Sequence, residues 1–366
     1  MMMASQRAKH PHTPKQNHPR PNKNQTGKAT SRPLTNPDAL DHAVRVVHSV
    51  CCLAGSASLI DDIRAELRAE GIPSAIRRHH TATLFDWLMS ALSYQGISDR
   101  VAYEYMARHG RAQWFDIEAK VAASPPCPKL KSYWHFYGCR YDKISRTCSE
   151  PDHIGACPVP SHQLRNGRLN QMAYSLFLFI RNIADGDLVG WIDRQFQGAD
   201  DRARPSRLAR LQEAVIGPLR EVYGVSDKVL TMTLSCILLA APRGRQNWVE
   251  VGVTMIAVDT LVHNFLHRTG ILRRFDAEHP YGAACYRPGN CADIIAQVSR
   301  QIDARDFNKT FPKIFPRFVQ HAIWRYCAQT GLDVCNGNRI DDAKPCDNIY
   351  CQLYRVCDRL AFTAPL

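Results

Sequence analysis

The sequence predicts a mostly α-helical protein, and three observations lead to that fold class. Apolar residues recur at helical spacing over most of the chain from Asp38 onward. The alternation of Val, Ile and Thr that is typical of half-buried strands is scarce. Hydrophobic residues make up 45% of the 366 residues, which is enough to bury a sizeable core. We therefore expect packed helices and few strands.

The helical pattern begins at Asn36-Pro37-Asp38, because asparagine caps helix N-termini well and proline is favoured in the first turn. This first helix is expected to continue through Val50. The segment 59–69 is a short amphipathic helix that Gly71 and Pro73 should end. Further helices are predicted over 83–93, 98–108, 168–183, 208–222, 228–240, 259–267, 292–302 and 317–328.

Two stretches break this pattern. Residues 1–37 are rich in Pro, Asn, Gln, Lys and His and are predicted to be disordered. They carry seven Lys or Arg residues and no acid, about half of the net charge of +13. Such a basic arm could raise non-specific affinity for nucleic acid through counterion release, or it could only solubilise the chain.

Residues 124–163 contain six prolines and four cysteines, and we interpret them as an inserted loop.

No segment resembles a signal peptide or a membrane span, since apolar runs such as 176–180 are too short to cross roughly 30 Å of hydrocarbon. We expect a monomer with no membrane association. We place it in the cytoplasm, associated with the nucleoid if the source is bacterial. Thiols stay reduced there, so the 14 cysteines indicate metal binding before disulfides.

Residues 251–270 are the most informative stretch, because they place a lone acid, Asp259, between an apolar run and a helix. Asp259 could cap that helix, stabilise developing positive charge as a catalytic carboxylate, or do both. Upstream, the residues from Tyr223 to Lys228 (Tyr-Gly-Val-Ser-Asp-Lys) indicate a tight turn that opens a second apolar helix. Lys228 could act as a nucleophile or only contact phosphate.

These residues carry a resemblance to a known family. The Tyr-Gly-Val-Ser-Asp-Lys turn, followed by Val-Asp-Thr at 258–260, resembles the helix-hairpin-helix and Gly/Pro-Asp core of the endonuclease III superfamily of DNA glycosylases. Leu92-Ser-Tyr-Gln-Gly-Ile-Ser-Asp looks like a helix end of that family, and the C-terminal cysteines follow a helix that contains Ile323 to Tyr326, as in the family. The resemblance covers about residues 78–357.

The resemblance implies a two-lobed helical fold and a base-excision activity on double-stranded DNA that contains a modified or damaged base. Residues 38–330 would form the helical core, which includes the Cys-rich insertion 124–163 and the hairpin and aspartate region 223–270. Residues 331–366 would form an iron–sulfur loop and the C-terminus. The catalytic residues would be Asp259, which supports cleavage of the N-glycosidic bond, and Lys228, which forms a Schiff base at C1′ and gives AP lyase activity.

The same resemblance assigns DNA contacts. Gly224, Val225 and Ser226 would hold a phosphate, and Gln95 would fill the gap left by the extruded base, although a simple helix-end turn at Gln95 is equally compatible with the sequence. Two departures stand out. Ser226 occupies the position of the hairpin's second glycine, and the interval to Asp259 is lengthened around 241–251. In that insertion Arg243, Arg245 and Trp248 could touch DNA or form an ordinary exposed loop.

The cysteines fall into groups. The C-terminal group resembles the family's [4Fe–4S] loop, although its spacing alone would permit zinc equally well, and Cys327 could replace one ligand; its members are Cys335, Cys346, Cys351 and Cys357. The inserted group is predicted to bind a structural metal, with zinc favoured over free thiols; its members are Cys127, Cys139, Cys148 and Cys157. Cys285 and Cys291 form a third pair, which could support either site or have no role.

Three alternative functions remain open at this stage. The chain could be a DNA-binding protein with a glycosylase-like fold that recognises modified DNA without cleaving it. It could be a monofunctional glycosylase that removes the base by hydrolysis only. It could also be a metal-stabilised regulator whose basic tail and Cys-rich loops bind RNA. The sequence does not indicate the target base.

Overall fold

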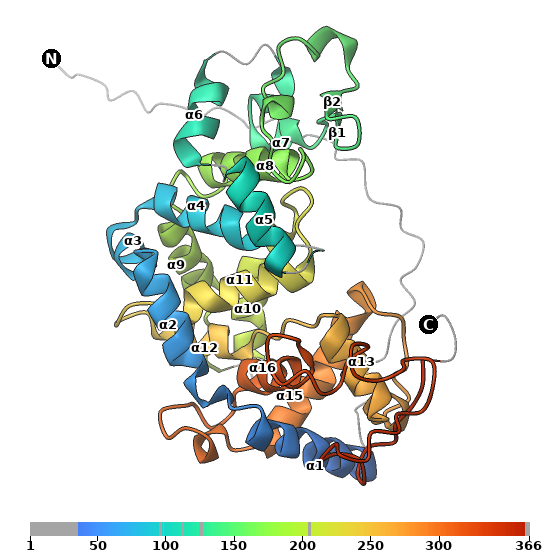
Figure 1. Cartoon of the computed structure of the whole chain (residues 1–366). Helices are drawn as coiled ribbons and strands as arrows, with labels where there is room; N and C mark the ends of the chain where they lie inside the picture. Colours follow the sequence, from blue (N-terminus) through green and yellow to red (C-terminus); the bar gives the residue numbers. More distant parts are fainter. Residues whose placement is uncertain are drawn as a thin grey trace, which may run out of the picture. The chain divides into compact units, whose positions relative to one another are not determined.

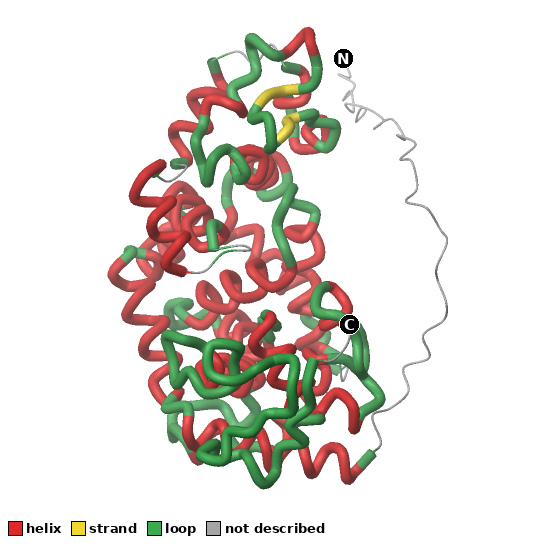
Figure 2. The backbone as a smooth tube through the Cα atoms, turned by 45° about the vertical axis from the view of Figure 1, so that its right-hand side comes forward, coloured by secondary structure: helices red, strands yellow, loops and turns green. Residues whose placement is uncertain are grey.

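Helices make up most of the chain, as Figures 1 and 2 show. The computed structural model describes residues 36–94, 97, 99–110, 113–123, 127–203 and 206–362. Within these ranges the only sheet is an antiparallel pair, β1 (Tyr141–Asp142) and β2 (Thr147–Cys148), in which Tyr141 lies opposite Cys148. The prediction of a mostly helical chain with few strands is therefore confirmed. The predictions for Gln95 and for nearly all of the basic tail concern residues outside these ranges.

Every helix predicted from apolar periodicity is present, with ends that move by a few residues. Asn36 caps the first of them, because its side-chain oxygen accepts a hydrogen bond of 3.2 Å from the amide of Ala39. The confirmed helices are α1 (Pro37–Leu53), α2 (Leu59–Ala69), α4 (Thr81–Leu92), α5 (Asp99–His109), α8 (Asn170–Asn182), α10 (Arg207–Arg220), α11 (Asp227–Leu239), α13 (Thr260–Arg268), α15 (Cys291–Gln301) and α16 (Pro316–Cys327).

Other helices were not predicted, mostly because they are short. They are α3 (Ile72–Arg78), α6 (Trp114–Ala122), α7 (Tyr133–Phe136), α9 (Leu188–Ala199), α12 (Gln246–Thr254) and α14 (Ile271–Arg274). Short 3₁₀ turns are η1 (Ser56–Ser58), η2 (Pro128–Leu130), η3 (Pro151–His153), η4 (Val159–Ser161), η5 (Ala283–Tyr286) and η6 (Ala304–Asp306). Gly71 and Pro73 do end α2, but the chain turns directly into α3, because Gly71 is left-handed and Pro73 suits a first helical turn.

Residues 34–366 form one compact unit with a continuous hydrophobic core. Helix α11 packs against α2, α4, α10 and α12. Helix α16 packs against α1, α12, α13 and α15, so the first helix (blue in Figure 1) lies beside the last ones (orange). Helix α12 therefore touches both groups, and it connects the helix that carries Lys228 with the helices around Asp259. The division into two lobes stays a prediction.

The C-terminal segment 328–362 (red in Figure 1) consists of turns and loops and bonds to the end of α13. The amide of Leu360 donates a hydrogen bond of 2.9 Å to the carbonyl of Arg268. Arg274 holds Asp358 through two hydrogen bonds of 2.7 and 2.9 Å. Gly270 is left-handed with φ +78°, and a Cβ there would collide with the Asp358 carboxylate. A glycine is therefore required where the loop meets α13.

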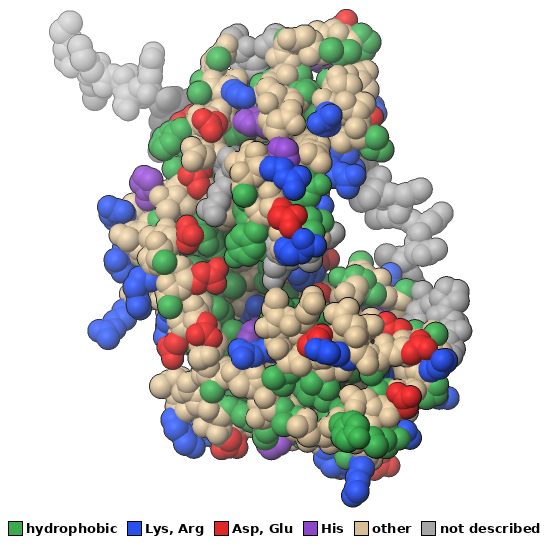
Figure 3. All heavy atoms as spheres, viewed as in Figure 1, with side chains coloured by type: hydrophobic (Ala, Val, Ile, Leu, Met, Phe, Trp, Pro, Cys, Tyr) green, Lys and Arg blue, Asp and Glu red, His purple; other side chains and the backbone are tan. Residues whose placement is uncertain are grey.

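The surface carries both signs of charge. On the face shown in Figure 3, basic and acidic side chains are interspersed. No single helix among the described ranges is long and apolar enough to cross a membrane. By length and composition alone, one pair of helical segments passes as a broken span, Pro37–Leu53 with Ser56–Ala69, and the two are bent by 82°.

Candidate functional site

Asp259 begins helix α13 as its N-cap. Its Oδ1 accepts a hydrogen bond of 2.9 Å from the amide of Val262, so the capping role expected from the sequence is confirmed. The chain reaches Asp259 through an extended, buried segment that ends at Val258. Burial raises the pKa of Asp259, whereas the Val262 amide and the charge of Lys228 act in the opposite direction. Asp259 is therefore a half-buried carboxyl group with a cation nearby.

Lys228 lies in the first turn of α11, directly after the loop that joins α10 to α11. Gly224 supplies the left-handed residue of this loop, with φ +77°, and Gly224 and Ser226 are exposed. Val225 is half-buried and packs against the core. Arg220 at the end of α10 forms an ion pair of 2.6 Å with Asp227 in the first turn of α11, which ties the two helices together. The turn predicted from the sequence is thus a helix–loop–helix in the structure.

Lys228 and Asp259 lie near enough to interact electrostatically although 30 residues separate them in the sequence, but they do not form an ion pair. The lysine is close enough for its charge to favour the ionised form of the aspartate. Each residue belongs to the N-terminus of a helix, and the partial positive charge at such ends favours anions nearby. This pair could stabilise a cationic intermediate and provide an amine nucleophile.

Three further side chains surround Asp259, and sequence reasoning missed all of them. The amide of Val258 donates to the Tyr286 hydroxyl at 3.0 Å. Burial, and then the charge of Asp259, raise the pKa of Tyr281. Arg317, on α16, is only 6% exposed, and its guanidinium interacts with Asp259 and Tyr286. These residues come from another loop and another helix, so no local motif connects them with Asp259.

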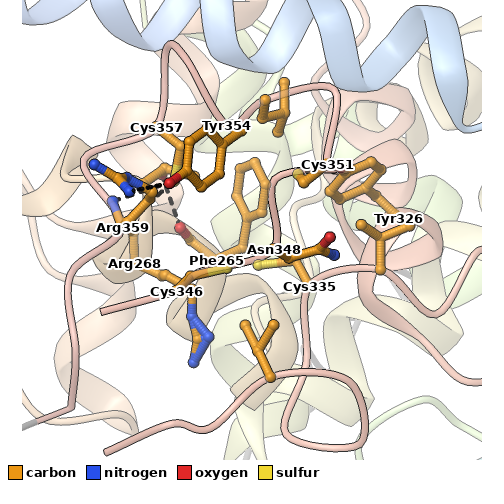
Figure 4. A pocket seen from close by; sticks show the side chains of 14 residues that line it. Phe265, Arg268, Tyr326, Cys335, Cys346, Asn348, Cys351, Tyr354, Cys357 and Arg359 are labelled. Carbon is orange, nitrogen blue, oxygen red and sulfur yellow. Dashed lines mark hydrogen bonds between the residues drawn. The ribbon is translucent and has the colours of Figure 1, made fainter. Parts of the chain in front are cut away.

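The four C-terminal cysteines line one cavity, which Figure 4 shows from close by. The Tyr326 hydroxyl lies 3.1 Å from the sulfur of Cys351. The amide of Arg359 donates a hydrogen bond of 3.3 Å to the sulfur of Cys357. Cys327 does not line this cavity but forms a hydrogen bond with Cys335. The structure therefore brings together the four residues that the sequence grouped, with Cys327 beside them.

The spacing of these sulfurs bears on what they could hold. A tetrahedral zinc ion with Zn–S bonds of about 2.3 Å places its sulfurs about 3.8 Å apart. Among the described residues, only one group of three or more His, Cys, Asp or Glu residues has all its ligand atoms within 4.8 Å of one another, and it does not include the C-terminal cysteines. The four C-terminal sulfur atoms therefore do not all lie within 4.8 Å of one another.

The inserted cysteines also converge. Cys157 interacts electrostatically with the other three members of its group, Cys127, Cys139 and Cys148, and they belong to the segment around η2, α7 and β2. They too fall outside the one group with ligand atoms within 4.8 Å. His162 is engaged elsewhere, because its Nε2 lies 3.0 Å from the Tyr174 hydroxyl. The prediction that these cysteines bind zinc stays a prediction.

The one tight group is His263, His279, Cys285 and Cys291, all buried, and it could hold a metal ion. From the sequence, Cys285 and Cys291 could support either metal site or have no role, and neither histidine was predicted as a ligand. One signal was present. His263 follows Asp259 by one helical turn, and His279, Cys285 and Cys291 follow at short intervals in a segment rich in turns. Ligands to metals often have such spacing, but the separation of His263 from the rest conceals it.

The insertion around 241–251 is an internal element. Trp248 is only 1% exposed, and its indole N–H donates a hydrogen bond of 2.6 Å to Asp193. Arg245 forms an ion pair of 3.0 Å with the same Asp193 and lies over the Trp248 ring. Trp248 is therefore a core residue. Neither the DNA contact nor the exposed loop that the sequence allowed applies to it. Arg243 is exposed.

Comparisons with protein-family models, with curated proteins and with solved structures each returned no match.

Proposed function

We propose that this protein is a DNA N-glycosylase of the helix-hairpin-helix type that also cleaves the strand at the resulting abasic site. The observation that carries the proposal is that Lys228 and Asp259, at the starts of α11 and α13, lie near enough for the lysine charge to act on the aspartate. The loop before α11, with its left-handed Gly224 and exposed Ser226, supports it, because the partial positive charge at the N-terminus of the following helix favours a phosphate.

In the proposed mechanism, the loop from Gly224 to Ser226 holds the DNA backbone, and the target nucleotide leaves the stack. The Asp259 carboxylate stabilises the positive charge that develops on the sugar as the base departs. The Lys228 amine then attacks C1′ to form a Schiff base, and β-elimination cuts the strand. Arg317 and Tyr286 would keep Asp259 oriented from the protein side.

A [4Fe–4S] cluster bound by the C-terminal cysteines forms the second part of the proposal. The four cysteines around one cavity support this part, because the family that the sequence resembles holds its cluster with four cysteines in this position. Amide-to-sulfur hydrogen bonds such as Arg359 to Cys357 are the kind that tune thiolate-bound clusters. When bound, the cluster would order this loop beside α13. For the inserted cysteines we keep zinc as the proposed metal.

The test begins with a duplex that carries a preformed abasic site, because this substrate does not depend on the unknown target base. Borohydride should trap wild-type protein covalently, and Lys228→Gln should abolish trapping. Lys309→Gln, which alters an exposed lysine, serves as the matched control and should trap like wild type. If Lys228→Gln traps as well as wild type, the lysine assignment is wrong.

A panel of duplexes with oxidised, deaminated, alkylated or mismatched bases then tests base release. We expect Asp259→Asn to lower release by about 10²- to 10³-fold, the usual cost of losing a charge-stabilising group, while DNA binding persists. Binding of modified duplexes by wild type, without any abasic-site formation across the panel, would favour the alternative of a non-catalytic DNA-binding protein. Base release without borohydride trapping would favour a monofunctional enzyme.

A further inference from the structure

The buried group His263, His279, Cys285 and Cys291 draws its members from separate parts of the chain. His263 lies on α13, His279 in the loop after α14, Cys285 in η5, and Cys291 at the first residue of α15. The two cysteines are 0% exposed and the histidines are 2% and 9% exposed. Two imidazoles and two thiols are thus withdrawn from water at one point, where thiols are only weak hydrogen-bond partners.

The distances within the group match a tetrahedral centre. The Nδ1 atom of His263 lies 3.5 Å from the sulfur of Cys285 and 3.4 Å from that of Cys291. The Nε2 atom of His279 also lies 3.4 Å from the sulfur of Cys291. A tetrahedral zinc ion with Zn–N of about 2.05 Å and Zn–S of about 2.3 Å separates nitrogen from sulfur by about 3.6 Å. Separate histidine–cysteine hydrogen bonds would not require one nitrogen to lie equally close to two sulfurs.

The surroundings of the group also prepare it for a metal. The Nδ1 of His279 lies 2.6 Å from the carbonyl of Ala277, so it carries the proton, and Nε2 keeps its lone pair for a ligand bond. Cys291 begins α15, and helix N-termini stabilise thiolates. The side chain of Asn290 donates a hydrogen bond of 2.8 Å to the carbonyl of Ala284, which closes the loop between the two cysteines.

We infer that His263, His279, Cys285 and Cys291 bind a structural Zn²⁺ ion that fastens α13 to α15. The two thiolates balance the charge of Zn²⁺, and together with two neutral imidazoles they fill all four positions of its tetrahedron. A site with no open position is typical of structural rather than catalytic zinc. Binding releases the two thiol protons to solvent.

The metal centre would also hold the start of α13 in place, and this effect does not depend on the proposed function. His263 follows Asp259 by one turn of α13, and Tyr286, the neighbour of Cys285, bonds to Val258 on the other side of Asp259. Both connections lead from the metal ligands to the start of α13. The ion would therefore fix the position of Asp259 without touching it.

Metal analysis of the full-length protein, purified under reducing conditions, is the first test. We expect the double variant Cys285→Ser/Cys291→Ser to contain one zinc ion per chain less than wild type. Cys51→Ser, a buried cysteine on α1, is the matched control and should keep the wild-type zinc content. Equal zinc in the double variant and wild type, or a Cys285–Cys291 disulfide in reduced protein, would overturn the inference.

X-ray absorption at the zinc edge of wild-type protein serves if the double variant does not fold. The zinc bound in the wild type should include a shell of nitrogen neighbours near 2.0–2.1 Å besides sulfur near 2.3 Å, as expected for mixed ligands. A pure sulfur shell would contradict the inference, because only this group combines imidazoles with thiols.

Hydrogen exchange tests the link to Asp259. Removal of zinc with a chelator should increase exchange in the peptide that covers α13, while the peptide that covers α2 stays unchanged. Unchanged protection of α13 in protein shown to have lost its zinc would show that the ion does not hold this helix.

Discussion

Helix α13 is held at its two ends by two different cysteine-containing groups. Near its start, His263 belongs to the tight group with ligand atoms within 4.8 Å of one another. At its end, Arg268 and Gly270 meet the loop that carries the four C-terminal cysteines around one cavity. The two groups thus differ in the spacing of their ligand atoms and in depth, because Cys285 and Cys291 are buried whereas the four C-terminal cysteines are half-buried.

The two groups also differ in what surrounds them. The tight group lies between helices α13 and α15, which pack against α16 through their own apolar faces. The C-terminal loop forms no helix after α16 and relies on polar contacts with α13 and α14. We therefore expect loss of the C-terminal centre to disorder its loop, and loss of the zinc centre to loosen the start of α13.

The largest expected effect is on iron content. Cys351→Ala should remove the iron and the broad absorption near about 400 nm that thiolate-bound iron gives, while zinc remains bound. Iron and zinc analysis of protein purified without oxygen measures both. Cys52→Ala, an exposed cysteine on α1, is the control and should change neither metal. Full iron content in Cys351→Ala, or zinc in place of iron in wild type, would remove the distinction between the two groups.

Local patterns predicted a great deal of this molecule. The alternation of apolar residues along each long helix, the cap at Asn36 and the turn at Gly224 are properties of neighbouring residues, so they can be seen in the sequence. The grouping of the four C-terminal cysteines likewise follows from their closeness in the chain. Their convergence on one cavity agrees with that grouping.

The surroundings of Asp259 could not be predicted in this way. The charge of Arg317 acts on it from α16, and Tyr286 bonds to the preceding residue Val258 from η5, at sequence separations that no motif spans. His263 was hidden because its partners lie far along the chain, and a single histidine in an apolar helix face indicates ordinary packing. Trp248 shows the opposite error. The arginines of the lengthened interval suggested DNA contact or an exposed loop, but the interval forms a helix in which Trp248 is buried.

A second prediction concerns a substitution that disturbs the C-terminal cysteine loop without changing any of its cysteines. Gly270→Ala places a methyl group against the Asp358 carboxylate at a left-handed position, and we expect a loss of about 1–3 kcal/mol in the free energy of unfolding. Iron should be retained less well, and zinc as in wild type. Denaturant unfolding and metal analysis measure these effects. Gly71→Ala, also left-handed but with nothing within 4 Å, should cost less. Equal losses would mean that backbone strain alone, and not the contact with the loop, explains the effect.

A third prediction concerns the start of α13 and its dependence on pH. Because burial raises the pKa of Asp259 above 3.8, folding is favoured when this carboxyl is protonated and loses stability as pH rises through the folded-state pKa. Asp259→Asn keeps a capping side chain and removes the charge. We expect a higher melting temperature than wild type at pH 7, and a gain that vanishes towards pH 3.8. A lower melting temperature at pH 7 would mean that attraction to Lys228 and Arg317 outweighs burial.

The smallest expected effect comes from the ion pair that joins the C-terminal loop to α14. Arg274→Gln should cost about 0.2–1 kcal/mol, because the Arg274 side chain is 42% exposed and solvent weakens such pairs. The hydrogen bonds from Arg274 lower the pKa of Asp358, so the pair's contribution is present above the ordinary carboxyl range and lost as pH falls through it. Urea unfolding at pH 7 and at low pH measures the difference. Arg305→Gln breaks an ion pair with Asp303 that lies within η6 and should leave iron retention unchanged. If Arg274→Gln releases iron as readily as Gly270→Ala does, the loop is held by this one pair rather than by its fit against Gly270.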